Sequence, residues 1–374
     1  MEEQKLSIVD HLADFSDQRD QRMIKHLLVD IVTIAIIAVI CGADNWEEIE
    51  LFGHSKEDWF RQFLKLPGGI PSHDTFNRVF SWLDPKEFQE RFLNWTETLR
   101  KCVAEVIAID GKTTRGSKDN GKVLHMVSAW ANSNRLILGQ VKRNDKSNEI
   151  TAIPELLDQI MIKKCIVTID AMGCQTAIAE KIIDKKADYI LALKGNQGTL
   201  HDDIKIFFES EIQDKHSPFS FDFAESMIKD HGRIDIRRCW VTNQIDWLVQ
   251  RDKWKGLQSI VMIESERHIN DQITKEHRFY ISSCKPDAKE LNKNIQAHWG
   301  VENSAHWVLD IAFREDECRT RKNNAPHNFA LIRHWALNLL RQEKTSKKSI
   351  RAKRLKAGWD MNYFIELLKL AKLA

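Results

Sequence analysis

The sequence has few of the features that mark secreted, zinc-binding or membrane proteins. Seven of its 374 residues are cysteine, and none of them forms a Cys-x-x-Cys pair. Cysteines scattered in this way are typical of small buried side chains in a reducing compartment, rather than of a disulfide framework or a zinc ribbon. The acidic N-terminus, MEEQKLSIVDHLADF, lacks the apolar core of a signal peptide. We therefore expect a cytoplasmic protein.

Long apolar runs and a strong excess of one charge are also absent. The most apolar run covers residues 31–43 and is too short to cross a bilayer, so it predicts a buried helix and no membrane partner. The formal net charge is +2, which does not by itself indicate a nucleic-acid partner. The charge is uneven, however, because residues 341–374 hold ten Lys or Arg against three Asp or Glu. This predicts a basic helical tail, which is either a solvated helix or a surface for a polyanion.

Three patterns follow one another along the chain, whose length suits two or three domains. Residues 1–100 have the apolar spacing of helices throughout, which predicts an all-helical N-terminal domain. Residues 101–340 alternate short apolar strands with helices, as in an α/β domain built on a mixed sheet. Within this domain, residues from about 212 to 285 alternate apolar and polar positions, which predicts a β-rich insertion.

Three carboxylates stand at unusual positions in this pattern. The apolar runs AEVIAID and KCIVTID end in Asp110 and Asp170, and the carboxyl ends of strands line the functional crevice of an open α/β sheet. An aspartate at a strand end also suits a turn or a helix cap. Glu302 interrupts the apolar stripe of a predicted helix, LNKNIQAHWGVENSAHWVLDIAF, so we expect it to face inward. It either closes a metal site or pairs with a buried arginine.

Carboxylates that converge in a partly buried site repel one another, and a divalent cation relieves that repulsion. Oxygen ligands without a thiol favour Mg²⁺ or Mn²⁺. Two such ions can activate a water or a 3′-hydroxyl for phosphodiester chemistry. A zinc site on His298, Glu302 and His306, which share one helix face, is an alternative, although the His-Glu-x-x-His pattern of zinc hydrolases is absent.

Basic side chains near the acids are candidates for phosphate contacts. They are Lys112, Arg115, Lys194 and Arg319. Each of them taken alone also fits a solvated surface charge. Asn77 and Arg78, on a short helix after a tight turn, fit either a DNA-reading element or an ordinary helical hairpin.

The motifs AIDGKTTRGS, TIDAMGCQ, YILALKGNQ and HWGVENSAHWVLDIAF resemble those of the DDE transposases associated with bacterial H-repeat and Rhs elements. The resemblance runs from LADFSDQR to ALNLL and so covers nearly the whole chain. It implies an RNase H-like catalytic domain, interrupted by the β-rich insertion and preceded by a helical associated domain. By motif match, the DDE triad falls on Asp110, Asp170 and Glu302. The resemblance also implies a cut-and-insert reaction on double-stranded DNA, with two Mg²⁺ or Mn²⁺ ions and a homodimer on the DNA.

The sequence departs from related insertion-sequence transposases around the glutamate. Those proteins often have Arg four residues before it and Lys seven residues after it, where this chain has His298 and Leu309. His298 is therefore a candidate to contact DNA in place of the arginine. Three other functions are compatible with the sequence: a DNA-binding remnant without chemistry, a nuclease that cuts without joining, and a zinc hydrolase.

Overall fold

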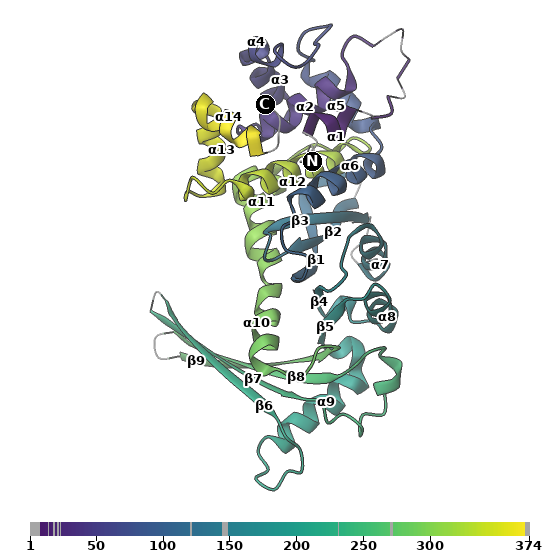
Figure 1. The fold of residues 1–374 in the computed structure, drawn as a ribbon, viewed down its shortest axis with the longest axis vertical. Coiled ribbons are helices and arrows are strands. Elements are labelled where there is room, and N and C mark those ends of the chain that lie inside the picture. Colours follow the sequence, from purple (N-terminus) through teal and green to yellow (C-terminus); the bar gives the residue numbers. More distant parts are fainter. Residues whose placement is uncertain are drawn as a thin grey trace, which may run out of the picture.

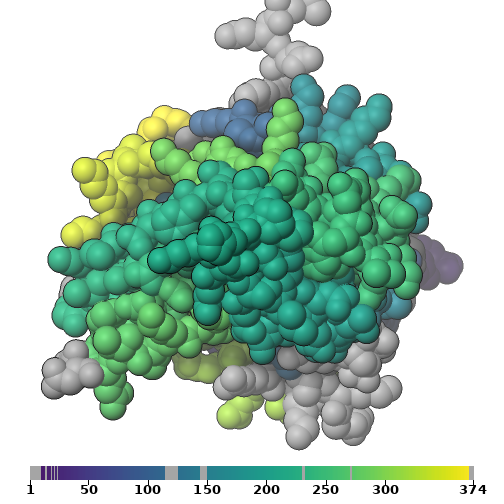
Figure 2. Space-filling view, turned by 90° about the horizontal axis from the view of Figure 1, so that it is seen from below, coloured from purple at the N-terminus to yellow at the C-terminus, as the bar shows by residue number. Residues whose placement is uncertain are grey.

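The computed structural model describes residues 8–370, except for residues 14, 18, 21, 23, 120–121, 144–148, 231 and 270–271. Helices from both ends of the sequence gather at one end of an elongated molecule, and a long sheet runs from its middle to the other end (Figure 1). Viewed from that other end, residues of about 200 to 300 cover most of the surface (Figure 2). The sequence thus separates into a helical end and a sheet end.

The described residues before 100 are helices and their connections, as the apolar spacing predicts. The helices are α1 (Ile8–Ala13), α2 (Leu28–Ile40), α3 (Trp46–Ser55), α4 (Glu57–Phe60), α5 (His73–Trp82) and α6 (Pro85–Leu99). The predicted buried helix is α2, in which every side chain from Ile31 to Ile40 is fully buried. Within the described part of the chain, no helix combines the length and apolarity that a bilayer span needs.

The C-terminal helices belong to the same helical end. They are α12 (Ala325–Gln342), α13 (Ile350–Trp359) and α14 (Met361–Leu370), and their apolar side chains join one core with those of α2. Arg354 of α13 donates to the carbonyls of Val39 (2.9 Å) and Ala43 (3.0 Å), and Lys353 pairs with Glu343 at 2.9 Å. The segment expected to be a basic tail is therefore packed into the body, and part of its positive charge is neutralised there.

The described strands form one nine-stranded mixed sheet in the order β3-β2-β1-β4-β5-β9-β8-β7-β6. They are β1 (Val106–Asp119), β2 (Lys122–Ala131), β3 (Leu136–Arg143), β4 (Ile166–Ile169), β5 (Asp188–Leu193), β6 (Asp222–Asp230), β7 (Arg233–Thr242), β8 (Ser259–Ile269) and β9 (Gln272–Ser282). Strands β1, β4 and β5 are parallel, and the other neighbours are antiparallel. The predicted β-rich insertion extends the central sheet, because β9 pairs directly with β5.

Helices cover both faces of this sheet. Helices α7 (Glu149–Gln159), α8 (Thr176–Asp184) and α9 (Gly198–Glu211) pack on one face, where they bury Ile107 and Ile109 of β1. Helix α10 (Ala288–His298) packs on the other face, against β1, β4, β6 and β7. A π-helical turn (Val301–His306) and helix α11 (Trp307–Phe313) continue from it toward the helical end.

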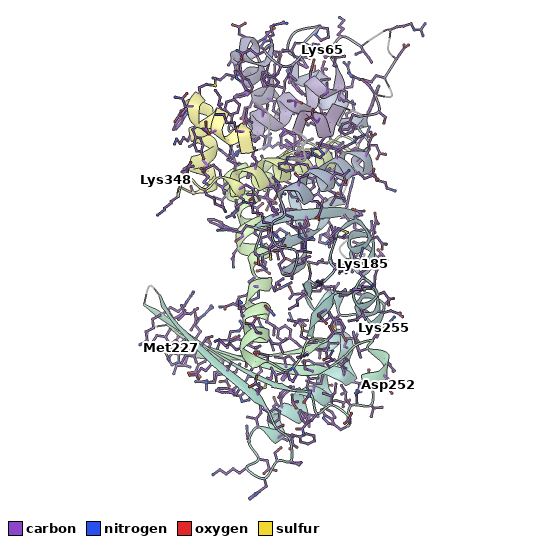
Figure 3. All side chains as sticks on the ribbon, in the orientation of Figure 1. Lys65, Lys185, Met227, Asp252, Lys255 and Lys348 are labelled. Carbon is purple, nitrogen blue, oxygen red and sulfur yellow. The ribbon has the colours of Figure 1, made fainter. Side chains whose placement is uncertain are left out.

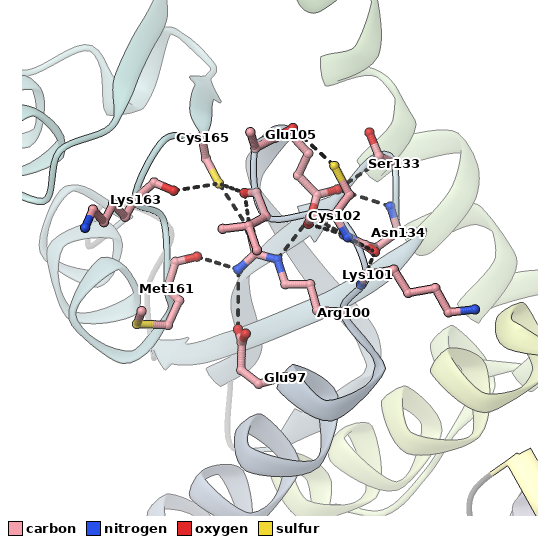
Figure 4. A network of polar contacts seen from close by, with 12 residues as sticks. Glu97, Arg100, Lys101, Cys102, Glu105, Ser133, Asn134, Met161, Lys163 and Cys165 are labelled. Carbon is pink, nitrogen blue, oxygen red and sulfur yellow. Dashed lines mark hydrogen bonds and ion pairs between the residues drawn. The ribbon is translucent and has the colours of Figure 1, made fainter. Parts of the chain in front are cut away.

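A polar network joins the end of α6 to the start of β1 (Figure 4). Arg100 donates to Glu105 at 3.2 Å and to the carbonyl of Met161 at 2.6 Å. Glu105, which is buried, also accepts the backbone N–H groups of Ser133 (2.9 Å) and Asn134 (3.1 Å). Because Arg100 and Glu105 flank the predicted domain boundary, this network fixes the helical end relative to β1.

Candidate active site

The register of two parallel strands brings Asp110 and Asp170 together. Strand β1 pairs with β4 from Val106–Ile166 to Ile109–Ile169, so the two aspartates follow the last pair on neighbouring strands. Neighbouring strands lie about 4.8 Å apart. Asp170 ends its strand, as predicted, but Asp110 does not, because β1 continues and Asp110 pairs with Ser128 of β2. Strand β1 can extend beyond the end of β4 because β2 supplies hydrogen-bond partners on its other side.

The alternation of side chains places both aspartates on the face covered by α10. Ile107 and Ile109 point into the core under α7 and α8, so Asp110 points the other way. Its Oδ2 lies 3.5 Å from Nδ1 of His306. In the same way Thr168, two residues before Asp170, meets Nδ1 of His298 at 3.0 Å from its Oγ1.

Glu302 lies in the π-helical turn and is exposed, so the expectation that it faces inward with the apolar stripe is wrong. Val301 and Ala305 are buried in its place. The wider π-helical turn changes which residues face the core, and such turns occur frequently at functional sites. A regular helical spacing therefore predicted the wrong environment for Glu302, and its catalytic role stays a prediction.

Gly300 allows this helix to approach the end of β2. A Cβ atom at residue 300 would lie 2.4 Å from Oδ1 of Asn132 and 3.2 Å from Nε1 of Trp130. Asn132 in turn donates to the carbonyl of Ala297 at 2.7 Å. The close contact fixes the position of the π-helical turn, and with it Glu302, relative to the central strands.

Asp110, Asp170 and Glu302 line one cavity of about 420 Å³, which we call the acidic cavity. Its wall also includes Lys194, Glu276, Arg278, Tyr280, His298 and Trp299. Among the described residues, no three His, Cys, Asp or Glu side chains are gathered closely enough to hold a metal ion. The structure thus brings the predicted acids to a common cavity without forming a compact metal site.

Lys112, one of the predicted phosphate contacts, is held in a cluster of charges, all of them largely buried except the partly exposed Asp310. Its Nζ lies 2.5 Å from Oδ1 of Asp310 and 2.5 Å from Oε2 of Glu315, and Arg333 lies 3.8 Å from the other oxygen of Glu315. We call these four residues the buried charge cluster. Burial raises the pKa of Glu315, but the charges of Lys112 and Arg333 outweigh it and lower that pKa to about 2. These contacts favour a structural role for Lys112, and its DNA contact stays a prediction.

The other predicted DNA-contact residues are spread over the molecule. Lys194 is exposed at the wall of the acidic cavity. His298 is in the same cavity, but burial lowers its pKa to about 4, so at neutral pH it does not supply the positive charge of an arginine. Arg319 lines a separate groove of about 1100 Å³ with Asn77. The side chain of Arg115 lies outside the described part of the structure.

Sequence reasoning missed the five residues that β9 contributes to the cavity, among them the charged side chains of Glu276 and Arg278. The alternation in HRFYISS indicates that Arg278 shares a face with Tyr280. Nothing in the sequence, however, indicates that this strand pairs with β5 and so reaches the cavity.

The chain matches two models of known families. Residues 101–339 match the Transposase DDE domain, and residues 9–96 match a DDE_Tnp_1-associated domain. "Putative transposase YncI" of Escherichia coli O157:H7 is 44% identical over 370 residues, which cover 97% of this chain and 94% of that protein. "H repeat-associated putative transposase YhhI" of E. coli strain K12 is 42% identical over 374 residues, which cover 96% of this chain and 97% of that protein.

A shorter relative is named "Inactive transposase YbfQ" in E. coli strain K12, and it is 42% identical over 74 residues, 20% of this chain and 88% of that protein. The two longer matches extend over both the helical and the α/β parts of the chain. Together with the family models they show that this chain belongs to the DDE transposases, among the H repeat-associated members of that family.

Proposed function

We propose that the protein cuts the ends of an insertion-sequence-like element and joins the freed 3′-hydroxyl to target DNA, with Asp110, Asp170 and Glu302 as the catalytic acids. The observation that carries this proposal is the convergence of the three acids, from β1, β4 and the π-helical turn, on one cavity. The cavity opens at the carboxyl ends of parallel strands, which is where open α/β sheets have their functional crevice.

The topology supports an RNase H-like core with an insertion. Strands β1 to β5 form a mixed unit, and β6 to β9 lie in the sequence between β5 and α10, the helix that leads to Glu302. The proposed insertion therefore separates the two aspartates from the glutamate in sequence. Its last strand contributes to the same cavity.

The donor groups fit hard divalent cations. The three acids offer only oxygen atoms, while the two nearby histidines contact Thr168 and Asp110. Such a donor set favours Mg²⁺ or Mn²⁺. Asp110, Asp170 and Glu302 would hold the two ions, which when bound supply the Lewis acid that activates a water or a 3′-hydroxyl.

The chain itself orients the acids and attracts the DNA. Oδ1 of Asp170 accepts the backbone N–H groups of Met172 (3.1 Å) and Gly173 (3.4 Å), which fixes the rotamer of its carboxylate. Thus Asp170 is also the helix cap that its position in the sequence allowed. Lys194, exposed at the cavity wall, is suited to contact a phosphate. Since an element has two ends, we propose that a homodimer acts on double-stranded DNA in the cytoplasm, bound to the nucleoid.

Cleavage of the DNA that flanks the gene tests this function. Purified protein is incubated with that DNA in Mg²⁺, Mn²⁺ or Ca²⁺, and strand breaks and joined products are mapped to the nucleotide. We expect Asp170→Asn and Glu302→Gln to lose cleavage by about 10³-fold or more. The matched control is Glu290→Gln, which removes an exposed carboxylate of α10 outside the cavity.

Three outcomes would contradict the proposal or its assignment of the catalytic acids. Binding without cleavage in any metal would support a catalytically inactive DNA-binding remnant. One short relative is named as an inactive transposase. Cuts without joined products would indicate a nuclease. Equal loss of cleavage in Glu290→Gln would show that the effect is not specific to the cavity acids.

A further inference from the structure

The register between β5 and β9 carries Arg278 and Glu276 to the edge where the catalytic acids lie. Leu193 pairs with Phe279 and Ala192 with Tyr280, in antiparallel sense. Arg278 and Glu276 therefore continue past the carboxyl end of β5. Tyr280 belongs to the core beneath α10, so its alternate neighbours Arg278 and Glu276 point to the same face as Asp110 and Asp170.

An indole holds the guanidinium of Arg278 beside the acids. The guanidinium carbon lies 5.2 Å from the ring centre of Trp299, three residues before Glu302. A second guanidinium, that of Arg237, is also 5.2 Å from this ring, and it is buried and donates to Oδ1 of Asn292 at 2.6 Å. Trp299 is thus within cation–π distance of two arginines, and 35% of the Arg278 side chain remains exposed.

One of the two hydrogen-bonding edges of the Arg278 guanidinium, formed by Nε and Nη2, is occupied by a carboxylate. Its Nε donates to Oε1 of Glu276 at 2.8 Å and its Nη2 donates to Oε2 at 3.0 Å. The hydrogen bonds from Arg278, and to a smaller extent the charge of Lys194, lower the pKa of Glu276. Phosphate oxygens match the same two-pronged geometry that this carboxylate fills.

The charge balance of the cavity makes the pairing of Glu276 with Arg278 important. Four carboxylates line the cavity, those of Asp110, Asp170, Glu276 and Glu302, and the permanent cations in its wall are Lys194 and Arg278. These side chains alone carry net negative charge, so before divalent cations bind, the cavity opposes an entering DNA strand. Because 59% of the Glu276 side chain is exposed, it can move into solvent without leaving a buried charge unpaired.

We propose that Arg278 binds a phosphate of the DNA strand that enters the acidic cavity, and that Glu276 occupies its guanidinium until the DNA displaces it. This inference rests on the proposed DNA transposase function. It gives β9 two roles, since the strand supplies both a phosphate-binding residue and a carboxylate that competes with DNA for it. On this proposal, a phosphate replaces the carboxylate at the Nε/Nη2 edge of the guanidinium when DNA enters the active site.

Binding of labelled duplex DNA by the full chain tests the proposal apart from cleavage. Anisotropy is measured in Ca²⁺ over a series of salt concentrations for wild type, Glu276→Gln, Arg278→Ala, Arg278→Lys and the Glu276→Gln/Arg278→Ala double variant. We expect Glu276→Gln to bind about 5-fold more tightly, and Arg278→Ala to bind about 10-fold more weakly with a salt slope smaller by about one. Arg278→Lys should restore little binding, because an ammonium lacks the planar fork.

The matched control is Asp184→Asn, which removes one carboxylate from an exposed ion pair with Lys255. Neither residue lines the cavity, and Figure 3 shows where Lys255 lies. The substitution should change DNA affinity by less than about 2-fold. In the Arg278→Ala background, Glu276→Gln should have no further effect. If Glu276→Gln strengthened DNA binding equally in wild type and in Arg278→Ala, the cause would be a general charge effect. The proposed exchange of Glu276 for a phosphate would then be wrong.

The results separate this inference from the proposed function. If wild type binds and cuts DNA but Arg278→Ala binds equally well with an unchanged urea midpoint, only the role of Arg278 fails. If wild type neither binds nor cuts DNA under any condition, the proposed function fails and the inference fails with it.

Discussion

The buried charge cluster and the acidic cavity use similar side chains for opposite purposes. In the cluster, Lys112 contacts both Asp310 and Glu315, and only 4% of the Glu315 side chain is exposed. In the cavity, Glu302 is exposed, and carboxylates outnumber the permanent cations. Each site includes one residue of β1 and at least one residue of the segment from 302 to 315.

The difference shows that the burial and pairing of a charged side chain decide whether it stabilises the fold or stays available for chemistry. A buried carboxylate must be paired, because removal of its partner leaves a charge in a poorly solvated place. An exposed carboxylate costs little when unpaired, so a site that recruits cations and a phosphate chain can keep its acids accessible. The following predictions test this contrast, in order of decreasing effect on the free energy of unfolding.

Lys112→Met should produce the largest loss of stability. The substitution keeps the aliphatic volume but leaves Glu315 buried without its closest cation, so we expect the free energy of unfolding to fall by about 3–5 kcal/mol. Urea unfolding followed by circular dichroism measures the change. Lys255→Met, at an exposed ion pair, should not change the midpoint measurably. A similar small effect for Lys112→Met would contradict a structural role for the cluster.

His334, buried next to the cluster, should make stability depend on pH. Burial lowers its pKa to about 4, whereas in the unfolded chain a histidine has a pKa of about 6.5. As the pH falls from 6.5 to 4, the unfolded state takes up a proton that the folded state refuses, so stability is lost in this window. The loss should reach about 3 kcal/mol at most by pH 4. The His334→Phe variant should lose less stability between pH 6.5 and pH 4 than wild type does. If the free energy of unfolding of both proteins depends on pH in the same way, the prediction is wrong.

Gly300→Ala should have an intermediate effect. The added Cβ would lie 2.4 Å from Oδ1 of Asn132, so we expect a cost of about 1–3 kcal/mol. The displaced π-helical turn should also lower DNA cleavage by moving Glu302 relative to Asp110. The cost should be smaller in an Asn132→Ala background, which removes the clash. Equal costs in both backgrounds, measured by urea unfolding, would mean that the contact does not set the position of the turn.

Glu302→Gln should have the smallest effect on stability. Because the side chain is exposed, its free energy of unfolding should stay within about 0.5 kcal/mol of wild type, while cleavage is lost. Glu315→Gln, the same substitution in the buried charge cluster, should destabilise clearly and so provides the matched comparison. If Glu302→Gln destabilised the fold as much as Glu315→Gln does, the contrast between the two sites would fail.

Local patterns in the sequence predict elements well but predict environments poorly. The alternation of SIVMIESERHI matches β8 over its full length, Ser259–Ile269, and the apolar run around Ile31 is the buried α2. The apolar stripe, by contrast, placed Glu302 on an inward face, because a regular helical period does not reveal a π-helical turn. The basic tail looked like a separate surface, although Arg354 binds the carbonyls of Val39 and Ala43 more than 300 positions earlier.

The sequence by itself determined most of the secondary-structure elements and singled out the three acids that we propose to be catalytic. Both inferences depend only on local spacing and on short motifs. The tertiary structure alone decided which charges are neutralised and which stay accessible. The pairing of Ala192 with Tyr280 brings Arg278 to the acids, and the contact with Glu315 removes Lys112 from the surface. Both outcomes depend on hydrogen bonds and ion pairs between residues far apart in the chain, whose partners no local pattern specifies.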